Sequence, residues 1–362
     1  METLQNDFAE CDTVAVSGEK CPGCGDNLQF DPVSGALKCP SCGTIKQIAA
    51  TPGMEFELRY MKKASDGWSR ETHVYHCSNC NAEQALDKRE IARVCPFCGS
   101  PSVVEREEFA VLRPDMLLPF SVGKQKAAET ASHWAKKRLF APDDFKKSFR
   151  AETLNGVYLP AFTFDAETYT DYSGVLCEHY TETVTVNGKP ETRRRTRTFS
   201  VSGDYQKSFN DFAVSATDVV PPRYINKIMY YDYHNSVLYE EDFLYGFSAR
   251  LGAQDGETCW AQARAQMETE VKRDILGQYS YDTVERFDMR TAYGGVTYRY
   301  LLIPIYLGNY FYKTKRYSFY INGRNGKMAG KSPVSALKVA LAVTIGLAVA
   351  ALAGLALYFL MK

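Results

Sequence analysis

The stretches that decide the fold are CPGC at 21–24, CPSC at 39–42, CSNC at 77–80 and CPFC at 95–98. The first two stretches enclose fourteen residues, as do the last two, and the second quartet of cysteines repeats the first at an offset of 56 positions. Because a CxxC turn presents two thiolates to one metal, two such turns supply the four ligands of a closed tetrahedral site. The spacing predicts two zinc ribbons, whose ligands are Cys21, Cys24, Cys39, Cys42, Cys77, Cys80, Cys95 and Cys98.

Four cysteine ligands leave no open coordination position, so both predicted Zn²⁺ sites are structural rather than catalytic. Iron remains an alternative metal, because CPxCG turns also suit iron bound by four cysteines. His73 and His76 lie beside Cys77, but the quartet is complete without them.

The composition of the 362-residue chain indicates an intracellular globular protein of two or three domains. The formal net charge is zero, which gives no general reason to expect a nucleic-acid partner. Outside the quartets only Cys11, Cys177 and Cys259 remain, and the polar N-terminus does not resemble a signal peptide. These features favour a reducing compartment and metal-bound thiolates over disulfides.

The segment 339–361 contains no charged residue and predicts a transmembrane helix. As a helix it would span about 34 Å, enough for a hydrocarbon core of about 30 Å. Basic residues precede it, which places that side in the cytoplasm by the positive-inside rule; they are Arg324, Lys327, Lys331 and Lys338. We therefore expect a C-terminal anchor in the cell membrane, crossing once, with the bulk of the chain in the cytoplasm. Its small residues Ala342, Gly346, Ala350 and Gly354 recur every four positions, which also allows self-association in the bilayer.

The order along the chain divides it into seven parts. We expect an acidic tail at 1–18, ribbon one at 19–46, a connector at 47–72, ribbon two at 73–102, an α+β domain at 103–330, a linker at 331–338 and the membrane helix at 339–361.

The α+β domain is expected to contain antiparallel sheet and two main helices. The helices are predicted near 124–139, with Leu139 on the apolar side, and near 257–276, ending at Gly277. Alternating patterns predict strands at 156–165, 174–186, 192–201, 284–290, 296–307 and 317–322. LPAFTF at 159–164 resembles IPIYLG at 303–308, and each follows one of the helices, so an internal duplication is one interpretation.

The most basic run, RRRTR at 193–197, has two interpretations. Either it binds phosphate or lipid headgroups, or its arginines pair with glutamates on a neighbouring strand in a ladder of opposite charges. A two-residue hairpin at Asn187-Gly188 would pair positions whose numbers sum to 375, placing Glu182 opposite Arg193 and Glu178 opposite Arg197. That register favours the ladder.

Charge also argues against nucleic acid as the partner of the ribbons. Residues 1–105 carry fifteen Asp and Glu against ten Lys and Arg, and each four-thiolate zinc site adds about −2. Phosphate-binding modules need the opposite sign. A protein partner is therefore the better expectation.

Signatures of catalysis are absent from the sequence. GKMAGKS at 326–332 has three residues between its glycines where a phosphate loop needs four. A cysteine–histidine pair could still assemble in three dimensions from His133, His179, His234, Cys177 and Cys259.

The whole arrangement resembles a poorly characterised family of bacterial membrane proteins described as containing a transcription factor IIB-type zinc ribbon. The matching stretches are CPFCGSP at 95–101, LPFSVGKQKA at 118–127, WAKKRLFAPDDF at 134–145, GVYLPAFTFDAETYTDYSG at 156–174 and YINGRNGKMAG at 320–330. The resemblance implies the architecture and zinc at the eight cysteines, and it implies no reaction.

The sequence thus predicts a membrane-anchored zinc-ribbon scaffold or adaptor that presents a cytoplasmic protein-interaction surface, without catalysis. The alternatives are a membrane-tethered nucleic-acid-binding regulator and an unrecognised hydrolase.

Overall fold

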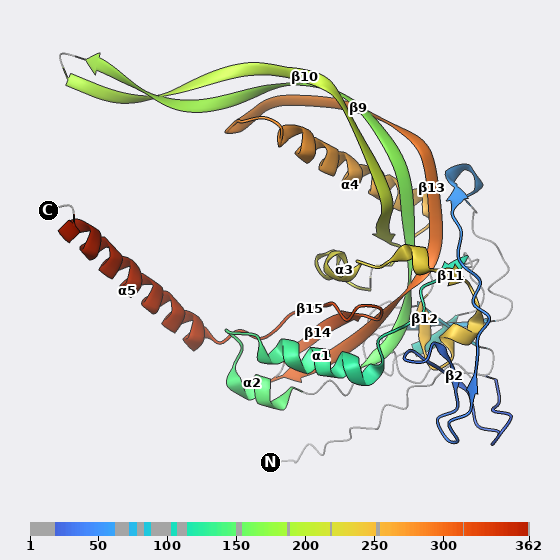
Figure 1. Cartoon of the computed structure of the whole chain (residues 1–362). Helices are drawn as coiled ribbons and strands as arrows, with labels where there is room; N and C mark the ends of the chain where they lie inside the picture. Colours follow the sequence, from blue (N-terminus) through green and yellow to red (C-terminus); the bar gives the residue numbers. More distant parts are fainter. Residues whose placement is uncertain are drawn as a thin grey trace.

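The computed structural model describes residues 19–61, 72–77, 83–87, 103–106, 114–149, 154–186, 189–217, 219–250, 254–313 and 315–360. The fold is α+β, with mainly antiparallel sheet, five α-helices and an apolar helix at the C-terminal end (Figure 1). This agrees with the expected fold class.

Three very long strands form the centre of the main sheet and extend beyond it as a curved arm (Figure 1). They are β9 (Asn155–Val186), β10 (Lys189–Ser215) and β13 (Thr283–Tyr312), with β9 in the middle. The expectation of separate strands at 156–165 and 174–186 is wrong, because β9 runs through both. The intervening residues 166–173 contain no Gly or Pro, and four of them are Thr or Tyr, which favour strands, so nothing ends the strand.

Short strands complete two sheets. The small sheet has the order β1 (Gln29–Asp31), β2 (Ala36–Lys38), β3 (Ile45–Lys46). The large sheet has the order β11-β8-β13-β9-β12-β6-β5-β7, with β10, β14, β15 and β4 attached at its sides. The bounds of these strands are β4 Phe56–Glu57, β5 Thr72–Cys77, β6 Glu83–Asp87, β7 Val103–Arg106, β8 Met116–Leu117, β11 Val237–Leu238, β12 Ser248–Arg250, β14 Lys315–Asn322 and β15 Met328–Gly330.

Both main helices are confirmed. The first, α1 (Lys124–Lys136), buries Ala127, Ala131 and Ala135 against the sheet. The expectation that it continues to Leu139 on the same apolar side is wrong, because the helix ends at Lys136 and Leu139 is exposed. Pro142 follows closely, and a residue before proline disfavours helical geometry.

The second main helix, α4 (Gly256–Leu276), covers the concave side of the arm (Figure 1). It begins at Asp255, whose side chain accepts a hydrogen bond from the Thr258 N–H at 2.8 Å, the usual role of an N-cap aspartate. Its buried residues recur every four positions, as one face of a helix requires; they are Cys259, Ala263, Met267, Val271 and Ile275, and they pack on a cluster that includes Phe162, Phe164, Tyr298 and Tyr300.

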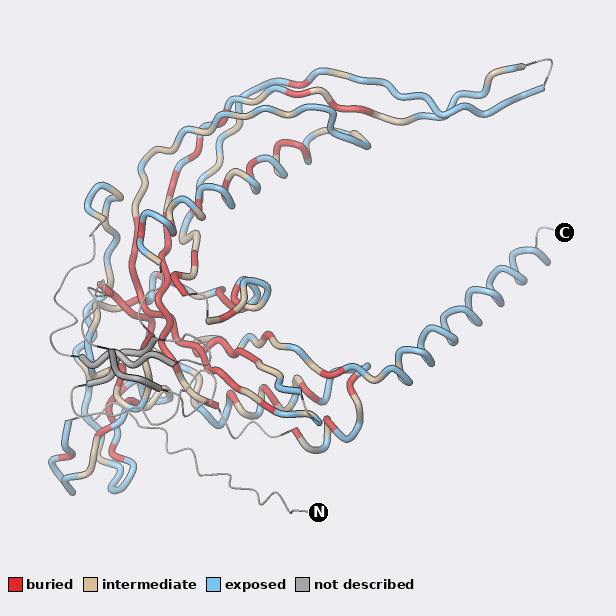
Figure 2. The backbone as a smooth tube through the Cα atoms, turned by 180° about the vertical axis from the view of Figure 1, so that it is seen from behind, coloured by how far each residue is buried: buried red, intermediate tan, exposed pale blue. Residues whose placement is uncertain are grey.

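The remaining helical elements are short, except for the C-terminal helix α5. They are α2 (Asp143–Ser148), α3 (Pro222–Ile228) and the 3₁₀ turns η1 (Leu58–Tyr60), η2 (Tyr233–Asn235) and η3 (Glu241–Leu244). The C-terminal helix α5 (Ala336–Leu360) is long and apolar enough to span a membrane. Its side chains are exposed along its length (Figure 2).

The pairing around β9 and β13 is symmetrical. Leu159 pairs with Ile303, and each of these strands has a short parallel neighbour, β12 beside β9 and β8 beside β13. A pseudo-twofold axis between β9 and β13 would exchange these elements, as the predicted duplication requires. The duplication itself stays a prediction.

The register of the arm is confirmed. Strand β10 pairs with β9 so that Arg193 faces Glu182, Arg195 faces Tyr180 and Arg197 faces Glu178. Arg197 and Glu178 form an ion pair of 2.6 Å, whereas Glu182 pairs diagonally with Arg195 at 3.2 Å. Arg193 pairs with Glu191 on its own strand at 3.2 Å. The basic run is therefore partly neutralised, as the ladder interpretation predicts.

Candidate metal centre

Two turns of nearly identical geometry hold the cysteines of the first quartet. The Cys21 N–H donates to the Asp26 carbonyl (2.7 Å) and the Gly25 N–H donates to the Cys21 carbonyl (2.9 Å). The same pattern recurs eighteen residues later, from Cys39 to Thr44 (2.9 Å) and from Gly43 to Cys39 (3.0 Å). Gly25 and Gly43 adopt left-handed φ values of 78° and 77°, which explains the glycine that follows each second cysteine.

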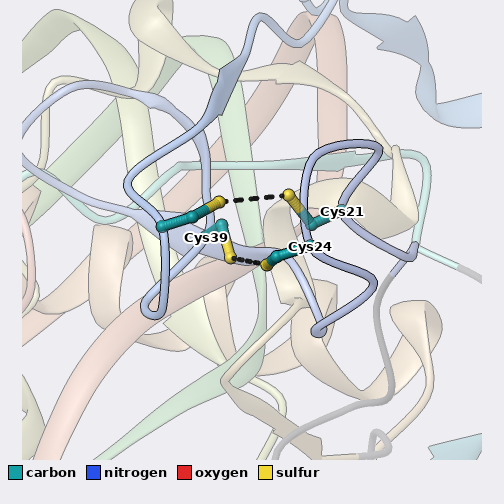
Figure 3. A group of neighbouring side chains, drawn as sticks. Cys21, Cys24 and Cys39 are labelled. Atoms are coloured by element: carbon teal, nitrogen blue, oxygen red, sulfur yellow. Dashed lines mark hydrogen bonds between the residues drawn. The ribbon is translucent and has the colours of Figure 1, made fainter.

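These turns aim the four sulfur atoms of Cys21, Cys24, Cys39 and Cys42 at one point, and Figure 3 shows three of these side chains labelled. The Sγ atoms all lie within 4.8 Å of one another. The Cys21–Cys42 and Cys24–Cys39 separations are 3.5 and 3.4 Å. A tetrahedral Zn²⁺ ion with Zn–S bonds of about 2.3 Å places its sulfurs about 3.8 Å apart. The quartet therefore fits a metal of zinc's size and preference for sulfur.

Hydrogen bonds to sulfur favour the thiolate form at two of the four cysteines. The Gly23 N–H donates to Cys21 Sγ at 3.4 Å. The side chain and the backbone N–H of Thr44 lower the pKa of Cys42 to about 6. At Cys24 the Asp26 N–H has the same effect, but the neighbouring sulfurs of Cys39 and Cys42 outweigh it and raise the pKa to about 12. A metal ion favours the thiolate form of each ligand that it binds.

The metal centre is built into the main hydrophobic core. Cys21 and Cys39 are buried in the same cluster as Leu28, Phe30 and Leu37. The Phe30 ring contacts the Phe243 ring at 5.3 Å, and the Phe30 N–H donates to the Tyr245 carbonyl at 2.9 Å. Segment 19–46 therefore packs as one side of the core that also holds α1 and α2.

The second quartet lies largely outside the described residues. Cys77 ends β5, and Cys80, Cys95 and Cys98 are not described. The described pairing beside Cys77 nevertheless follows the repeat: His76 pairs with Glu83, as Lys20 pairs with Asn27 56 positions earlier. Among the described residues the structure brings together one four-cysteine group, and the second zinc site stays a prediction.

The structure also reveals a buried ionic cluster that sequence reasoning missed. The Arg299 guanidinium forms ion pairs with Asp211 and Glu55, and its side chain is only 6% exposed. The Asp211 N–H donates to the Asp165 carboxylate at 2.6 Å, and His234 lies 3.4 Å from Asp211. Desolvation, together with the negative charges of Glu55 and Asp211, raises the pKa of Asp165.

A signal for this cluster was present in the sequence. Arg299 interrupts the otherwise apolar and aromatic run 298–307, and a charge in a buried strand requires a partner. The partners are Glu55, which immediately precedes β4, and Asp211 of β10, so only the tertiary structure could identify them.

Four of the five residues considered for a cysteine–histidine pair contact other groups instead. His179 Nδ1 contacts Thr196 Oγ1 at 2.9 Å, and Cys177 Sγ lies 3.8 Å from Glu285. Cys259 lies 3.8 Å from Gln254, and burial raises its pKa to about 12. His133 is on α1 and His234 is beside Asp211. Nothing in the described part of the chain joins two of the five.

Comparison with known proteins adds a relative without an assigned activity. The chain is 28% identical over 324 residues to a protein of Bacillus subtilis (strain 168) that is described as uncharacterized protein YdjG. The alignment covers 89% of this chain and 91% of the relative. No family profile matches the chain, and no solved structure matches it.

Proposed function

We propose that the chain is a membrane-anchored scaffold whose cytoplasmic part, organised by structural zinc, presents a surface for a protein partner. We also propose two Zn²⁺ ions per chain and membership of the family of membrane proteins with a transcription factor IIB-type zinc ribbon.

The observation that carries the proposal is the closed geometry of the first quartet. Four sulfurs converge at tetrahedral spacing, and two of the four cysteines are buried in the main core. A metal held there stabilises packing and has no coordination position left for a substrate. That supports a structural role for the metal.

The charge distribution supports a protein rather than a nucleic acid as partner. Residues 1–105 have five more acidic than basic side chains, before any thiolate is counted. The most basic run of the chain is partly neutralised by Glu178, Glu182 and Glu191. Neither feature provides the uncompensated positive surface that phosphate binding requires.

The apolar helix α5 supports the anchor. Arg324, Lys327, Lys331 and Lys338 precede it and favour a cytoplasmic location for the rest of the chain. This side also has the reducing conditions that thiolate ligands need.

The test is affinity capture of the full chain from detergent-solubilised membranes, with partners identified by mass spectrometry and metal measured in the same sample. We expect two zinc ions per chain and a reproducible set of protein partners. In Cys39→Ser we expect one zinc ion fewer and the loss of those partners.

Cys177→Ser is the matched control, because Cys177 is a buried thiol outside both quartets. It should retain the metal and the partners. A metal-free folded chain, or binding of an oligonucleotide with steep salt dependence in place of protein partners, would overturn the proposal.

A further inference from the structure

The first turn of α5 is attached to the connection between α1 and α2. The Ser335 N–H donates to the Phe140 carbonyl at 2.8 Å. The Lys338 ammonium donates to the Ala141 carbonyl at 3.0 Å and forms an ion pair with Asp143. These contacts hold residues 139–143 at the base of α5 (Figure 1). The same residues would therefore lie where α5 enters a bilayer, whatever the tilt of the helix.

Further contacts tie two more segments to this point. The Tyr312 hydroxyl donates to the Asp144 carboxylate at 2.8 Å, and the Phe145 ring lies 5.2 Å from the Tyr310 ring. The Tyr310 hydroxyl donates to the Lys331 carbonyl at 2.7 Å. Residues 136–147, 311–313, 315–316 and 331–338 therefore surround the base of α5, and we call them the juxtamembrane collar.

The collar is strongly basic, unlike the chain as a whole. It contains two acidic residues, Asp143 and Asp144. Its ten basic residues are Lys136, Lys137, Arg138, Lys146, Lys147, Lys313, Lys315, Arg316, Lys331 and Lys338. The net charge of +8 on this surface contrasts with zero for the whole chain.

The collar also exposes large apolar side chains between its charges. Leu139 is 79% exposed, Phe140 45% and Phe311 73%. Among the residues outside α5 whose side-chain burial is described, no other Leu or Phe is exposed to this degree. Three exposed apolar side chains within a basic surface are typical of a protein face that rests on a membrane.

We propose that the juxtamembrane collar is a binding surface for anionic phospholipids of the leaflet that α5 enters. Leu139, Phe140 and Phe311 enter the interfacial region, and the Lys and Arg side chains bind headgroup phosphates. The bilayer is the occupant because the collar is continuous with α5 through the Ser335 and Lys338 contacts. The proposal rests on membrane anchoring by α5.

The test uses the full chain in nanodiscs of pure phosphatidylcholine and of a mixture rich in phosphatidylglycerol. Flotation with the lipid reports anchoring by α5 and is expected in both. Hydrogen–deuterium exchange of peptides covering 136–147 reports the collar. We expect this exchange to be about fivefold or more slower on the anionic bilayer, since one charge near such a surface contributes roughly that factor.

Two variants test the basic and the apolar side chains of the collar separately. K136Q/K137Q/R138Q should markedly reduce the difference between the two bilayers. L139S/F140S should raise exchange on both bilayers, while the backbone carbonyl of residue 140 still accepts from the Ser335 N–H. R193Q/R194Q/R195Q, which removes three charges from the distal arm, is the matched control and should behave like the parent chain.

The outcomes distinguish this inference from the proposed function. Flotation with equal exchange on both bilayers overturns the collar proposal and leaves the anchor intact. Absence of flotation overturns the anchor and the collar together. Protection of 136–147 that rises with protein concentration, rather than with anionic lipid, would identify a second copy of the chain as the occupant and overturn the proposal.

Discussion

Asp165 is an acid that its surroundings hold towards the neutral form. Desolvation and the neighbouring carboxylates of Glu55 and Asp211 raise its pKa, while Arg299 opposes this effect. A raised pKa means that the folded state binds the proton more tightly than the unfolded state. Its contribution to stability is therefore fully present below the unfolded pKa of about 3.9 and is lost as the pH rises through the folded pKa.

Asp165→Asn should raise the melting temperature at pH 7 by about 1–3 °C, because it removes a partly buried negative charge. The amide oxygen can still accept from the Asp211 N–H. The gain should shrink as the pH falls towards 4, where the parent carboxyl is protonated as well. Thermal unfolding of the detergent-solubilised chain across this range checks the prediction. Asp288→Asn, an exposed acid on β13, should show no such trend, and a pH-independent gain at Asp165 would contradict the stated cause.

At the scale of single residues, the sequence predicted the contacts that depend on the spacing of nearby residues. Cys21, Cys24, Cys39 and Cys42 converge as their spacing requires. Arg299 and its acids were not predicted as a cluster, because Glu55, Asp211 and Arg299 come from three distant parts of the chain. Sequence shows that a buried charge needs a partner but does not identify it.

Strand β13 contains a glycine that leaves room for an aromatic ring of the neighbouring strand. Gly308 pairs directly with Phe319 of β14, and a Cβ atom added at Gly308 would lie 2.0 Å from the Phe319 ring. That ring is fully buried and stays confined by its neighbours. The position therefore needs glycine for space rather than for a special backbone conformation.

Gly308→Ala should lower the free energy of unfolding by about 1–3 kcal/mol, as expected for an overpacked core. Urea unfolding followed by tyrosine and tryptophan fluorescence measures it. Gly294→Ala on the same strand is the control, because its Cβ would meet the Tyr169 ring at an ordinary 3.6 Å. Equal effects at the two positions would argue against the steric explanation.

The arm provides a second prediction at this scale. Arg197 is largely exposed and Glu178 is partly exposed, so a double-mutant cycle with alanine should give a coupling free energy of about 0.2–1 kcal/mol. The coupling should decrease at high salt because exposed charges are screened. A coupling that is larger, or insensitive to salt, would indicate that the pair is buried by something the isolated chain lacks.

For the main elements, the type (helix or strand) was predicted better than the length. The helices at 124–136 and 256–276 and the register of the arm follow from periodicity and turn chemistry. The lengths of β9, β10 and β13 do not, because a strand of about 30 residues is far above the usual length, and only pairing with its neighbours sustains it.

At the scale of the whole molecule, the metal centre and the main core are continuous. Phe30 contacts Phe243 and Phe247, and Phe247 stacks on Phe120 at 4.3 Å. By contrast, α4 packs in a separate cluster on the arm. The two regions should therefore respond differently when the metal is removed.

A thiol-compatible chelator should increase hydrogen exchange first in 19–46, then in 241–247 and 118–131, while α4 stays protected. The physical reason is that structural zinc contributes folding free energy where its ligands pack. Exchange measured by mass spectrometry before and after chelation, with zinc added back, checks the order and its reversibility. Simultaneous loss of protection in α4 would mean that the molecule unfolds as a single unit.

The position of α5 after every other described element has a consequence for biosynthesis. Residues 19–330 leave the ribosome before α5 does, and domains generally fold in that order. The cysteine quartet can therefore acquire its ion, and the long strands can pair, while the chain is still in water. On the proposed function, α5 would insert into lipid after the residues that precede it have folded. If zinc were scarce, those residues would be misfolded when α5 inserts.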